Sequence, residues 1–159
     1  MQVNLNQKYM RLAINAARKN LKTFKGGPFG ACIVKGDKVL AVAANTVLCQ
    51  DATCHAEVNA IRIASKKIKG FDLTGATVYS TTEPCPMCFS ALHWARVEAI
   101  VYGTTVNDAA RAGFNELKIT NKTLKSLGKA KIKITAGVLV TECKALFKDW
   151  AKSPHPPVY

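Results

Sequence analysis

Two short segments that lie well apart in the sequence constrain this chain most. The first is Cys-His-Ala-Glu at residues 54–57, and the second is Glu-Pro-Cys-Pro-Met-Cys at residues 83–88. They supply one histidine and two cysteines, His55, Cys85 and Cys88, which are ligand types that zinc prefers. Three protein ligands leave one coordination position open for water or substrate. The fold must therefore bring the two segments together at one point.

Each segment is expected to stand at the start of a helix. Cys85 and Cys88 are three residues apart, so on the first turn of a helix they point to the same side. Prolines at this helix start cost no hydrogen bond, and the positive end of the helix dipole favours thiolates. His55 must come from the N-terminus of a different helix. Two helix N-termini that converge at one end of a sheet would place all three ligands together.

Glu57 follows His55 by two residues, so it points to a different side of the same helix. It need not bind the metal, and it can instead carry a proton from an attacking water to a leaving amine. Zinc supplies the nucleophile, because it makes water acidic enough to ionise near neutral pH. The pattern H-x-E followed by P-C-x-x-C is a recognised signature of zinc-dependent base deaminases.

Two other interpretations of the cysteine pair are weaker. A C-x-x-C motif in an α/β protein can be a thioredoxin-type redox pair, but that motif comes without a separate H-x-E segment. A closed structural zinc site needs a fourth ligand, which His93 or His155 could supply. His93 lies five residues beyond Cys88 on the same helix and should point away from it. An open catalytic zinc site is therefore favoured.

The composition is typical of a globular protein. The 159 residues are 48% hydrophobic and 21% charged, which suits a single domain spanning residues 1–159. No apolar run approaches the roughly 18 residues needed to cross a bilayer, and the N-terminus lacks the pattern of a secretory signal. We therefore expect a cytoplasmic protein with reduced cysteines and no membrane association.

The formal net charge of +13 leaves nucleic acid open as a partner. However, 18 of the 23 basic residues are lysines and only five are arginines, and arginine is better suited to bidentate phosphate contacts. The densest basic region, residues 118–133, has six lysines and no aromatic residue. The charge therefore favours a solvated basic surface, with tRNA as a less favoured partner.

Periodic hydrophobic patterns predict an α/β fold. Strands are predicted at residues 29–34, 39–44, 77–81, 99–103 and 131–135, and helices at residues 6–22, 54–67, 85–95, 108–113 and 141–151. Residues 117–127 are ambiguous. The alternation predicts a three-layer α/β/α sandwich with a five-stranded mixed sheet, in which an opening hairpin is followed by parallel pairing. Residues 152–159 carry three prolines and are predicted to form an extended arm.

From residue 26 to residue 150 the chain resembles the cytidine deaminase-like superfamily, and within it the bacterial guanine deaminases. Besides the two metal segments, the matching pieces are Gly-Gly-Pro-Phe-Gly-Ala at 26–31, Asn45, Trp-Ala-Arg at 94–96, and Asp-Ala-Ala with Ala-Gly-Phe at 108–114. The tRNA adenosine deaminases share the metal segments but usually carry valine where Phe29 stands. The resemblance therefore implies a cytidine deaminase-like fold and a small nucleobase as substrate.

The resemblance also implies residue roles. His55, Cys85 and Cys88 would bind one zinc ion, and Glu57 would transfer protons. Six further residues would contact the substrate, and these are Phe29, Asn45, Ala56, Trp94, Glu116 and Tyr159. The family further implies a homodimer, in which the C-terminal arm crosses over so that Tyr159 reaches the partner's pocket.

Asn115 and Glu116 bear on the choice of substrate. Guanine deaminases have an acidic pair here, whereas this chain has Asn115 in place of the first acid and Glu116 where Asp is usual. A carboxylate only accepts hydrogen bonds, and guanine presents N1–H and its 2-amino group as adjacent donors, whereas adenine presents a lone pair at N1. We therefore expect deamination of guanine to xanthine and ammonia.

Other functions stay open at this point. One is conversion of the tRNA wobble adenosine to inosine, and another is deamination of cytosine, a triazine or a nucleoside. A non-enzymatic alternative is a nucleic-acid-binding module with a structural zinc.

Overall fold

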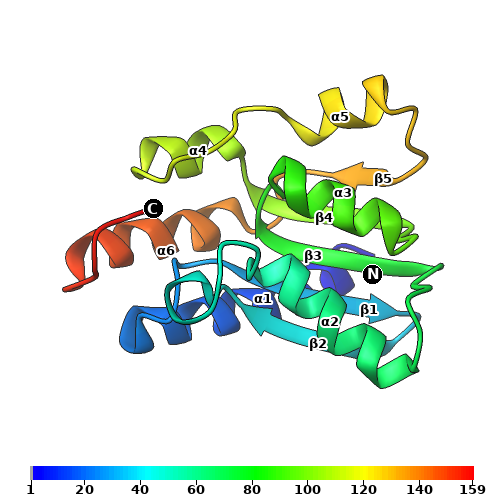
Figure 1. Cartoon of the computed structure of the whole chain (residues 1–159), viewed down its shortest axis with the longest axis horizontal. Helices are drawn as coiled ribbons and strands as arrows, with labels where there is room; N and C mark the ends of the chain where they lie inside the picture. The colour runs from blue at the N-terminus through cyan, green and yellow to red at the C-terminus, as the bar shows by residue number, and fades with distance from the viewer. Residues whose placement is uncertain (1) are drawn as a thin grey trace.

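The computed structural model describes residues 2–159, with side chains from Asn6 onward (Figure 1). Five strands form one sheet in the order β2-β1-β3-β4-β5. The strands are β1 (Gly30–Lys35), β2 (Lys38–Ala44), β3 (Ala76–Thr82), β4 (Ala99–Thr104) and β5 (Lys133–Thr135). The helices are α1 (Gln2–Thr23), α2 (Ala56–Ile68), α3 (Pro86–Trp94), α4 (Val106–Arg111), α5 (Asn121–Leu127) and α6 (Val140–Lys152), with a short 3-10 helix η1 (Val47–Cys49).

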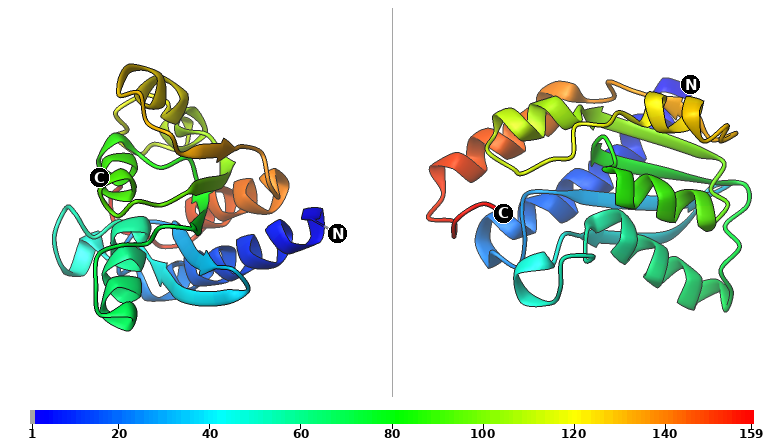
Figure 2. Two further views of the ribbon diagram at one scale, coloured as in Figure 1. Left: turned by 90° about the vertical axis from the view of Figure 1, so that its right-hand side faces the viewer. Right: turned by 45° about the horizontal axis from the view of Figure 1, so that its top comes forward.

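Helices cover both faces of the sheet, which confirms the predicted three-layer α/β/α sandwich (Figure 2). On one face, Met10 of α1 and Leu146 of α6 belong to a buried cluster with residues of β1, β3 and β4. On the other face, Ala60 of α2 and Leu92 of α3 belong to a second buried cluster. The zinc-ligand segments lie at the start of the helices on this second face.

Helix α1 is the longest helix and packs closely against the sheet. Its buried residues recur at helical spacing and are Tyr9, Met10, Ala13, Ile14 and Ala17. At Gly30, a Cβ atom would lie 2.0 Å from the carbonyl oxygen of Ala13, so any larger residue would push the helix away from β1. Neither α1 nor another helix within residues 2–159 combines the length and the apolar character needed to cross a membrane.

The sheet is mixed, as predicted, but one pairing differs from the expectation. β1 and β2 form the predicted antiparallel hairpin, and β3 pairs in parallel with β4, as does β4 with β5. The expectation that all pairing after the hairpin is parallel is wrong for β3, which pairs antiparallel with β1. The cause is the crossover through α2, which leaves β2, passes β1 and delivers the chain to the far side of β1.

Several element boundaries also differ from the prediction. The helix expected at residues 108–113 begins at Val106, because Thr105 and Asp108 form a reciprocal capping box. The ambiguous stretch 117–127 becomes helical only from Asn121, where the Thr120 side chain caps α5. Residues 112–120 between α4 and α5 therefore have no regular structure, and they pass beside the ends of the central strands.

Candidate metal centre and substrate pocket

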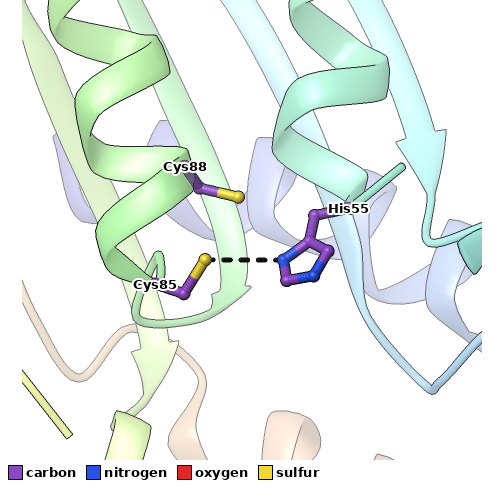
Figure 3. A group of neighbouring side chains, drawn as sticks. All are labelled: His55, Cys85 and Cys88. Carbon is purple, nitrogen blue, oxygen red and sulfur yellow. Dashed lines mark hydrogen bonds between the residues drawn. The ribbon is translucent and has the colours of Figure 1, made fainter. Parts of the chain in front are cut away.

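The predicted metal ligands meet where α2 and α3 begin, at one end of the sheet (Figure 3). His55 is the N-cap of α2, Cys85 is the N-cap of α3, and Cys88 lies on the first turn of α3. Their ligand atoms all lie within 4.8 Å of one another, and Cys85 Sγ lies 3.5 Å from His55 Nδ1. Two sulfur donors and one imidazole at this spacing fit a tetrahedral zinc ion with one open position.

The proton affinities of the two thiols are pushed in opposite directions. A hydrogen bond from Cys88, assisted by His55, lowers the pKa of Cys85 to about 4 in spite of burial. The same hydrogen bond, together with burial and the charge of Glu57, raises the pKa of Cys88 well above its usual range. Cys85 is therefore a thiolate at neutral pH, whereas Cys88 must lose a proton when a metal binds.

His55 is also affected by its neighbours. Burial lowers its pKa, but the hydrogen bond to Cys85 and the charges of Glu57 and Cys85 outweigh burial, so the net shift is upward. The imidazole ligates a metal only in its neutral form, so metal uptake at this cluster releases protons.

Glu57 lies beside the three donors without being one of them. It is 6% exposed, its Oε1 accepts a hydrogen bond from Ser80 Oγ at 2.8 Å, and its Oε2 accepts one from Cys88 Sγ at 3.4 Å. Burial first, and then the charge of Cys85, raise the pKa of Glu57. A carboxyl group with a raised pKa takes up a proton more readily than a free carboxylate does, which suits a group that accepts and returns a proton.

A cavity of about 110 Å³ opens at the metal cluster. Its lining residues are Phe29, Asn45, His55, Glu57, Thr82, Glu83, Cys85, Phe114, Asn115, Glu116 and Tyr159. The structure thus brings four of the six predicted substrate residues to the metal ligands, although they come from distant parts of the chain. Burial, followed by the charge of Cys85, raises the pKa of Glu116 to about 7.

The Asn45 side chain is held in one orientation. Its Oδ1 accepts hydrogen bonds from Val47 N at 3.1 Å and from Tyr159 Oη at 2.7 Å, and Tyr159 Oη in turn accepts one from Gly27 N at 2.8 Å. Two donors thus occupy the amide oxygen, so Asn45 offers a ligand its Nδ2 donor. Gly26 is required here, because a Cβ atom at this position would lie 2.1 Å from Asn45 Oδ1.

Tyr159 reaches the pocket of its own chain, whereas the sequence analysis expects it in a partner's pocket. Its carbonyl oxygen accepts a hydrogen bond from Asn115 N at 3.2 Å, and its ring lies 6.0 Å from that of Phe114. Upstream in the arm, His155 stacks on Trp150 at 4.8 Å. The arm can therefore complete the cavity without a second chain, and exchange between chains stays a prediction.

Trp94 is the predicted substrate residue that the structure places elsewhere. It ends α3, its side chain is 75% exposed, and it lines a separate groove beside Leu127. In the single chain it lies outside the cavity, because α3 runs away from the metal end and its last residue lies about a helix length from Cys85. A substrate contact by Trp94 therefore stays a prediction.

The remaining candidates occupy other positions. The methyl group of Ala56 is fully buried, so only its backbone could reach a substrate. His93 is exposed and lines the groove beside Trp94, and His155 lies on the C-terminal arm. Among the residues that the structure describes, the metal cluster consists of His55, Cys85 and Cys88 alone, so the structure does not support a closed four-ligand site.

Two residues that the sequence analysis did not single out also belong to the site. Ser80 holds the Glu57 carboxylate, and Glu83 lines the cavity. Ser80 lies two residues before Thr82 on β3, so both side chains point to the same face of the sheet. The two-residue spacing of polar side chains along β3 is the one sequence pattern that could have indicated a role for Ser80.

Comparison with known proteins agrees with this geometry. The family model of the cytidine and deoxycytidylate deaminase zinc-binding region matches residues 3–104. Guanine deaminase of Bacillus subtilis (strain 168) is 36% identical over 155 residues, which cover 97% of this chain and 99% of that protein. A tRNA-specific adenosine deaminase of Buchnera aphidicola subsp. Schizaphis graminum is 32% identical over 79% of this chain and 81% of its own length.

Among solved structures, that of a guanine deaminase from Nitrosomonas europaea is similar, with a TM-score of 0.83 at 26% identity. The match covers 92% of this chain and 84% of that chain. The region matched by the family model contains both segments that bring the donors together. With the layered fold and the three zinc-type donors, these matches show that the chain belongs to the cytidine and deoxycytidylate deaminase family of zinc enzymes.

Proposed function

We propose that residues 1–159 form a single zinc-dependent deaminase domain that hydrolyses guanine to xanthine and ammonia. The observation that carries this proposal is the cavity itself, which His55, Cys85 and Glu57 line together with Asn45 and Glu116. The near full-length similarity to a guanine deaminase supports the same substrate. Guanine and one water molecule then yield xanthine and one ammonia, without any redox change.

His55, Cys85 and Cys88 would hold the zinc ion. When bound at such a three-ligand centre, zinc activates water for attack near neutral pH. Glu57 would take a proton from that water and deliver it to the departing amine, a task that its raised pKa suits. Ser80 holds the Glu57 carboxylate by a hydrogen bond, so the proton is moved from a fixed position.

The opposite wall would select the base. The Glu116 carboxylate would accept hydrogen bonds from N1–H and the 2-amino group of guanine, and Asn45 Nδ2 would donate to a ring acceptor. Phe29 would cover the planar ring, and it is itself held edge-on by Phe114 at 4.8 Å between ring centroids. At about 110 Å³, the cavity is small beside the roughly 300–1,000 Å³ of sites for drug-sized ligands, which favours a free base.

A tRNA wobble adenosine is the second candidate substrate. It is favoured by the similarity to tRNA-specific adenosine deaminases and by the exposed lysines in residues 118–133. The Tyr159 side chain argues against it, because it lines the cavity and is hydrogen-bonded to Asn45, and a cavity of about 110 Å³ leaves little room for a ribose and its phosphates. Guanine is therefore preferred.

We also propose that the protein is a cytoplasmic homodimer. Helix α3 is rich in apolar residues, yet Met87 is 36% and Trp94 is 75% exposed, and a second copy that covers this row would bury it. The six cysteines are all free, which suits a reducing compartment. Exchange of the arm at residues 152–159 between the two chains would keep the Tyr159 contacts while making them intermolecular.

The proposed activity can be tested by ammonia release from zinc-loaded protein. The panel consists of guanine, guanosine, adenosine, cytosine, cytidine and ammeline, with a parallel assay for inosine in tRNA. We expect guanine to be turned over well above the others. Guanine left intact while tRNA acquires inosine would contradict the proposal and favour the second candidate.

A further inference from the structure

Glu83 has no part in the proposed chemistry, yet it is buried where the two halves of the site meet. It follows β3 directly, two residues before Cys85, and it is 5% exposed. Its backbone N–H donates to the carbonyl oxygen of Thr104 at 2.7 Å, which continues the pairing of β3 with β4. Its backbone is therefore fixed at the ends of the two central strands.

The Glu83 carboxylate accepts a hydrogen bond from the first residue of each of two helices. Oε2 accepts from Val106 N at 3.2 Å, at the start of α4, and Oε1 accepts from Asn121 N at 2.7 Å, at the start of α5. N–H groups in a first turn have no partner within their own helix, and the helix dipole favours a negative charge there. One carboxylate thus satisfies two helix N-termini.

These two contacts lie at the two ends of residues 106–121, the segment that carries Asn115 and Glu116 in the cavity wall. From Val106 to Asn121 the chain leaves the Glu83 carboxylate and returns to it, and in between it carries Asn115 and Glu116, both of which line the cavity. Fixing both ends of a loop removes much of its conformational freedom. The placement of Glu116 therefore depends on Glu83.

A further contact ties the same junction to a metal ligand. Asn121 Nδ2 donates to the carbonyl oxygen of Pro84 at 2.5 Å, immediately before Cys85. Asn121 is fully buried, so it has little room to move. Helix α5 is thus fixed to the carboxylate by its backbone and to the Cys85 segment by a side chain.

We propose that Glu83 is a positioning residue that couples the metal ligand Cys85 to the wall that carries Glu116. The inference rests on the proposed function for the meaning of that wall, but its contacts are independent of any substrate. Direct contact between Glu83 and a substrate is the competing role, because Glu83 also lines the cavity. Both carboxylate oxygens are already engaged by helix N–H groups, which favours the positioning role.

Glu83→Gln is the sharpest variant, because it keeps the size of the side chain and replaces one acceptor with a donor. Its amide NH₂ would face one of the two helix N–H groups, so one of the two hydrogen bonds is lost. We expect release of zinc to a chromogenic chelator to become at least about tenfold faster, because loss of a hydrogen bond that supports a metal ligand typically weakens metal binding by about 10–100-fold. We also expect faster amide hydrogen exchange across residues 112–120.

Asp108→Asn is the matched control. Asp108 caps α4 by accepting from Thr105 N at 3.0 Å, and its ion pairs are with Arg111 and Lys144. The variant weakens the cap of the same helix without changing the contacts of Cys85 or α5, so zinc release should match that of the wild type. Equal acceleration in Asp108→Asn and Glu83→Gln would overturn the proposal, because general weakening of α4 would then explain both.

Glu83→Gln with wild-type zinc release and wild-type exchange at residues 112–120, but lower kcat/KM, would also overturn the proposal in favour of substrate contact. If Glu83→Gln does not fold, Asn121→Ala tests the coupling by removing the bond to Pro84. Faster zinc release in that variant supports the proposal, and an unchanged rate contradicts it. The zinc-release and hydrogen-exchange measurements need no substrate, so failure to turn over guanine would remove the proposed function alone.

Discussion

The two sides of the cavity are built in different ways. On the metal side, His55 and Glu57 come from the start of α2, and Cys85 and Cys88 come from the start of α3. On the opposite side, Phe29 directly precedes β1 and Asn45 directly follows β2, and the other residues come from residues 112–120 and from the end of the C-terminal arm. The metal side thus consists of short local motifs on regular structure, whereas the opposite wall is assembled from irregular segments that are far apart in the sequence.

This difference suggests a division of roles. The reaction is set by groups whose positions follow from helix N-terminal geometry, and the family model ends at residue 104, before the wall segments 112–120 and 152–159 begin. In the proposed function, the choice of base would be set by groups held through long-range contacts, such as the bond from Tyr159 to Asn45. Changes on the metal side should abolish turnover, and changes on the wall should mainly alter which base is used and how tightly.

Glu57→Gln should have the largest effect. The amide keeps the size of the carboxyl group and can still accept a hydrogen bond from Ser80, but it cannot transfer a proton, so kcat should fall by about 10²–10⁴-fold. Zinc content should stay at that of the wild type, which metal analysis of the purified variant would check. Turnover within about tenfold of the wild type would be incompatible with the proton-transfer role.

Removal of zinc should abolish turnover and destabilise the protein. A ligand that binds only the folded state stabilises it by about 2.7 kcal/mol at a hundredfold excess over its Kd, so stripped protein should melt at a lower temperature. Binding requires loss of the Cys88 proton, whose pKa is raised, so zinc affinity should weaken as the pH falls. Stripped protein that keeps full turnover in the presence of chelator would refute the catalytic zinc site.

Glu116→Gln should weaken selection without removing the reaction. Loss of a charged hydrogen bond worth about 1.5–3 kcal/mol should lower kcat/KM for guanine by about 10–150-fold. The preference for guanine over adenine should also shrink, because an amide can donate to the lone pair at N1 of adenine. Asn115→Ala, at the neighbouring cavity position, is the control and should change the preference less.

The pH dependence gives a second test of Glu116. Its pKa is raised to about 7, and only the ionised carboxylate accepts both hydrogen bonds, so kcat/KM for guanine should rise as the pH increases toward and through 7. Zinc would neutralise the charge of Cys85, which is the second cause of the raised pKa, so the midpoint in the loaded enzyme should lie at or below that value. In Glu116→Gln, the rise of kcat/KM for guanine with pH should be absent.

Tyr159→Phe should have a smaller effect. It removes the hydrogen bond that Tyr159 Oη accepts from Gly27 N and the one that it donates to Asn45 Oδ1. The bond to Asn45, which orients the amide, is worth about 0.5–1.5 kcal/mol. We expect KM for guanine to rise by about 2–12-fold while kcat changes little, as measured by initial rates across guanine concentrations. A large loss of kcat at constant KM would show that Tyr159 takes part in the chemical step and not mainly in binding the base.

Trp94→Ala should have the smallest effect on turnover, because its side chain lies outside the cavity. Analytical ultracentrifugation of the same variant would test the proposed dimer. The dimer of the variant should be weaker, so it should dissociate at a higher protein concentration than that of the wild type. Normal assembly together with strongly reduced turnover would show that Trp94 acts at a catalytic site.

The same contrast explains what the sequence could and could not predict. The α/β/α layers follow from periodic patterns, and the donor cluster follows from two local motifs, so both could be predicted before the structure was known. The antiparallel pairing of β1 with β3 was missed, because it depends on where α2 leads the chain. The orientation of Asn45 was not predictable either, since Tyr159 and Val47 fix it through contacts that leave no pattern in the sequence.

The central claim is that the metal ligands and Glu57 catalyse deamination, and that the wall with Asn45 and Glu116 selects guanine. The most direct measurement is a competition, in which zinc-loaded protein is given guanine and unmodified tRNA in one reaction and both xanthine and inosine are quantified. We predict that xanthine accumulates with an equal amount of ammonia, while the wobble adenosine of the tRNA stays unchanged. Inosine in the tRNA with no xanthine would contradict the claim.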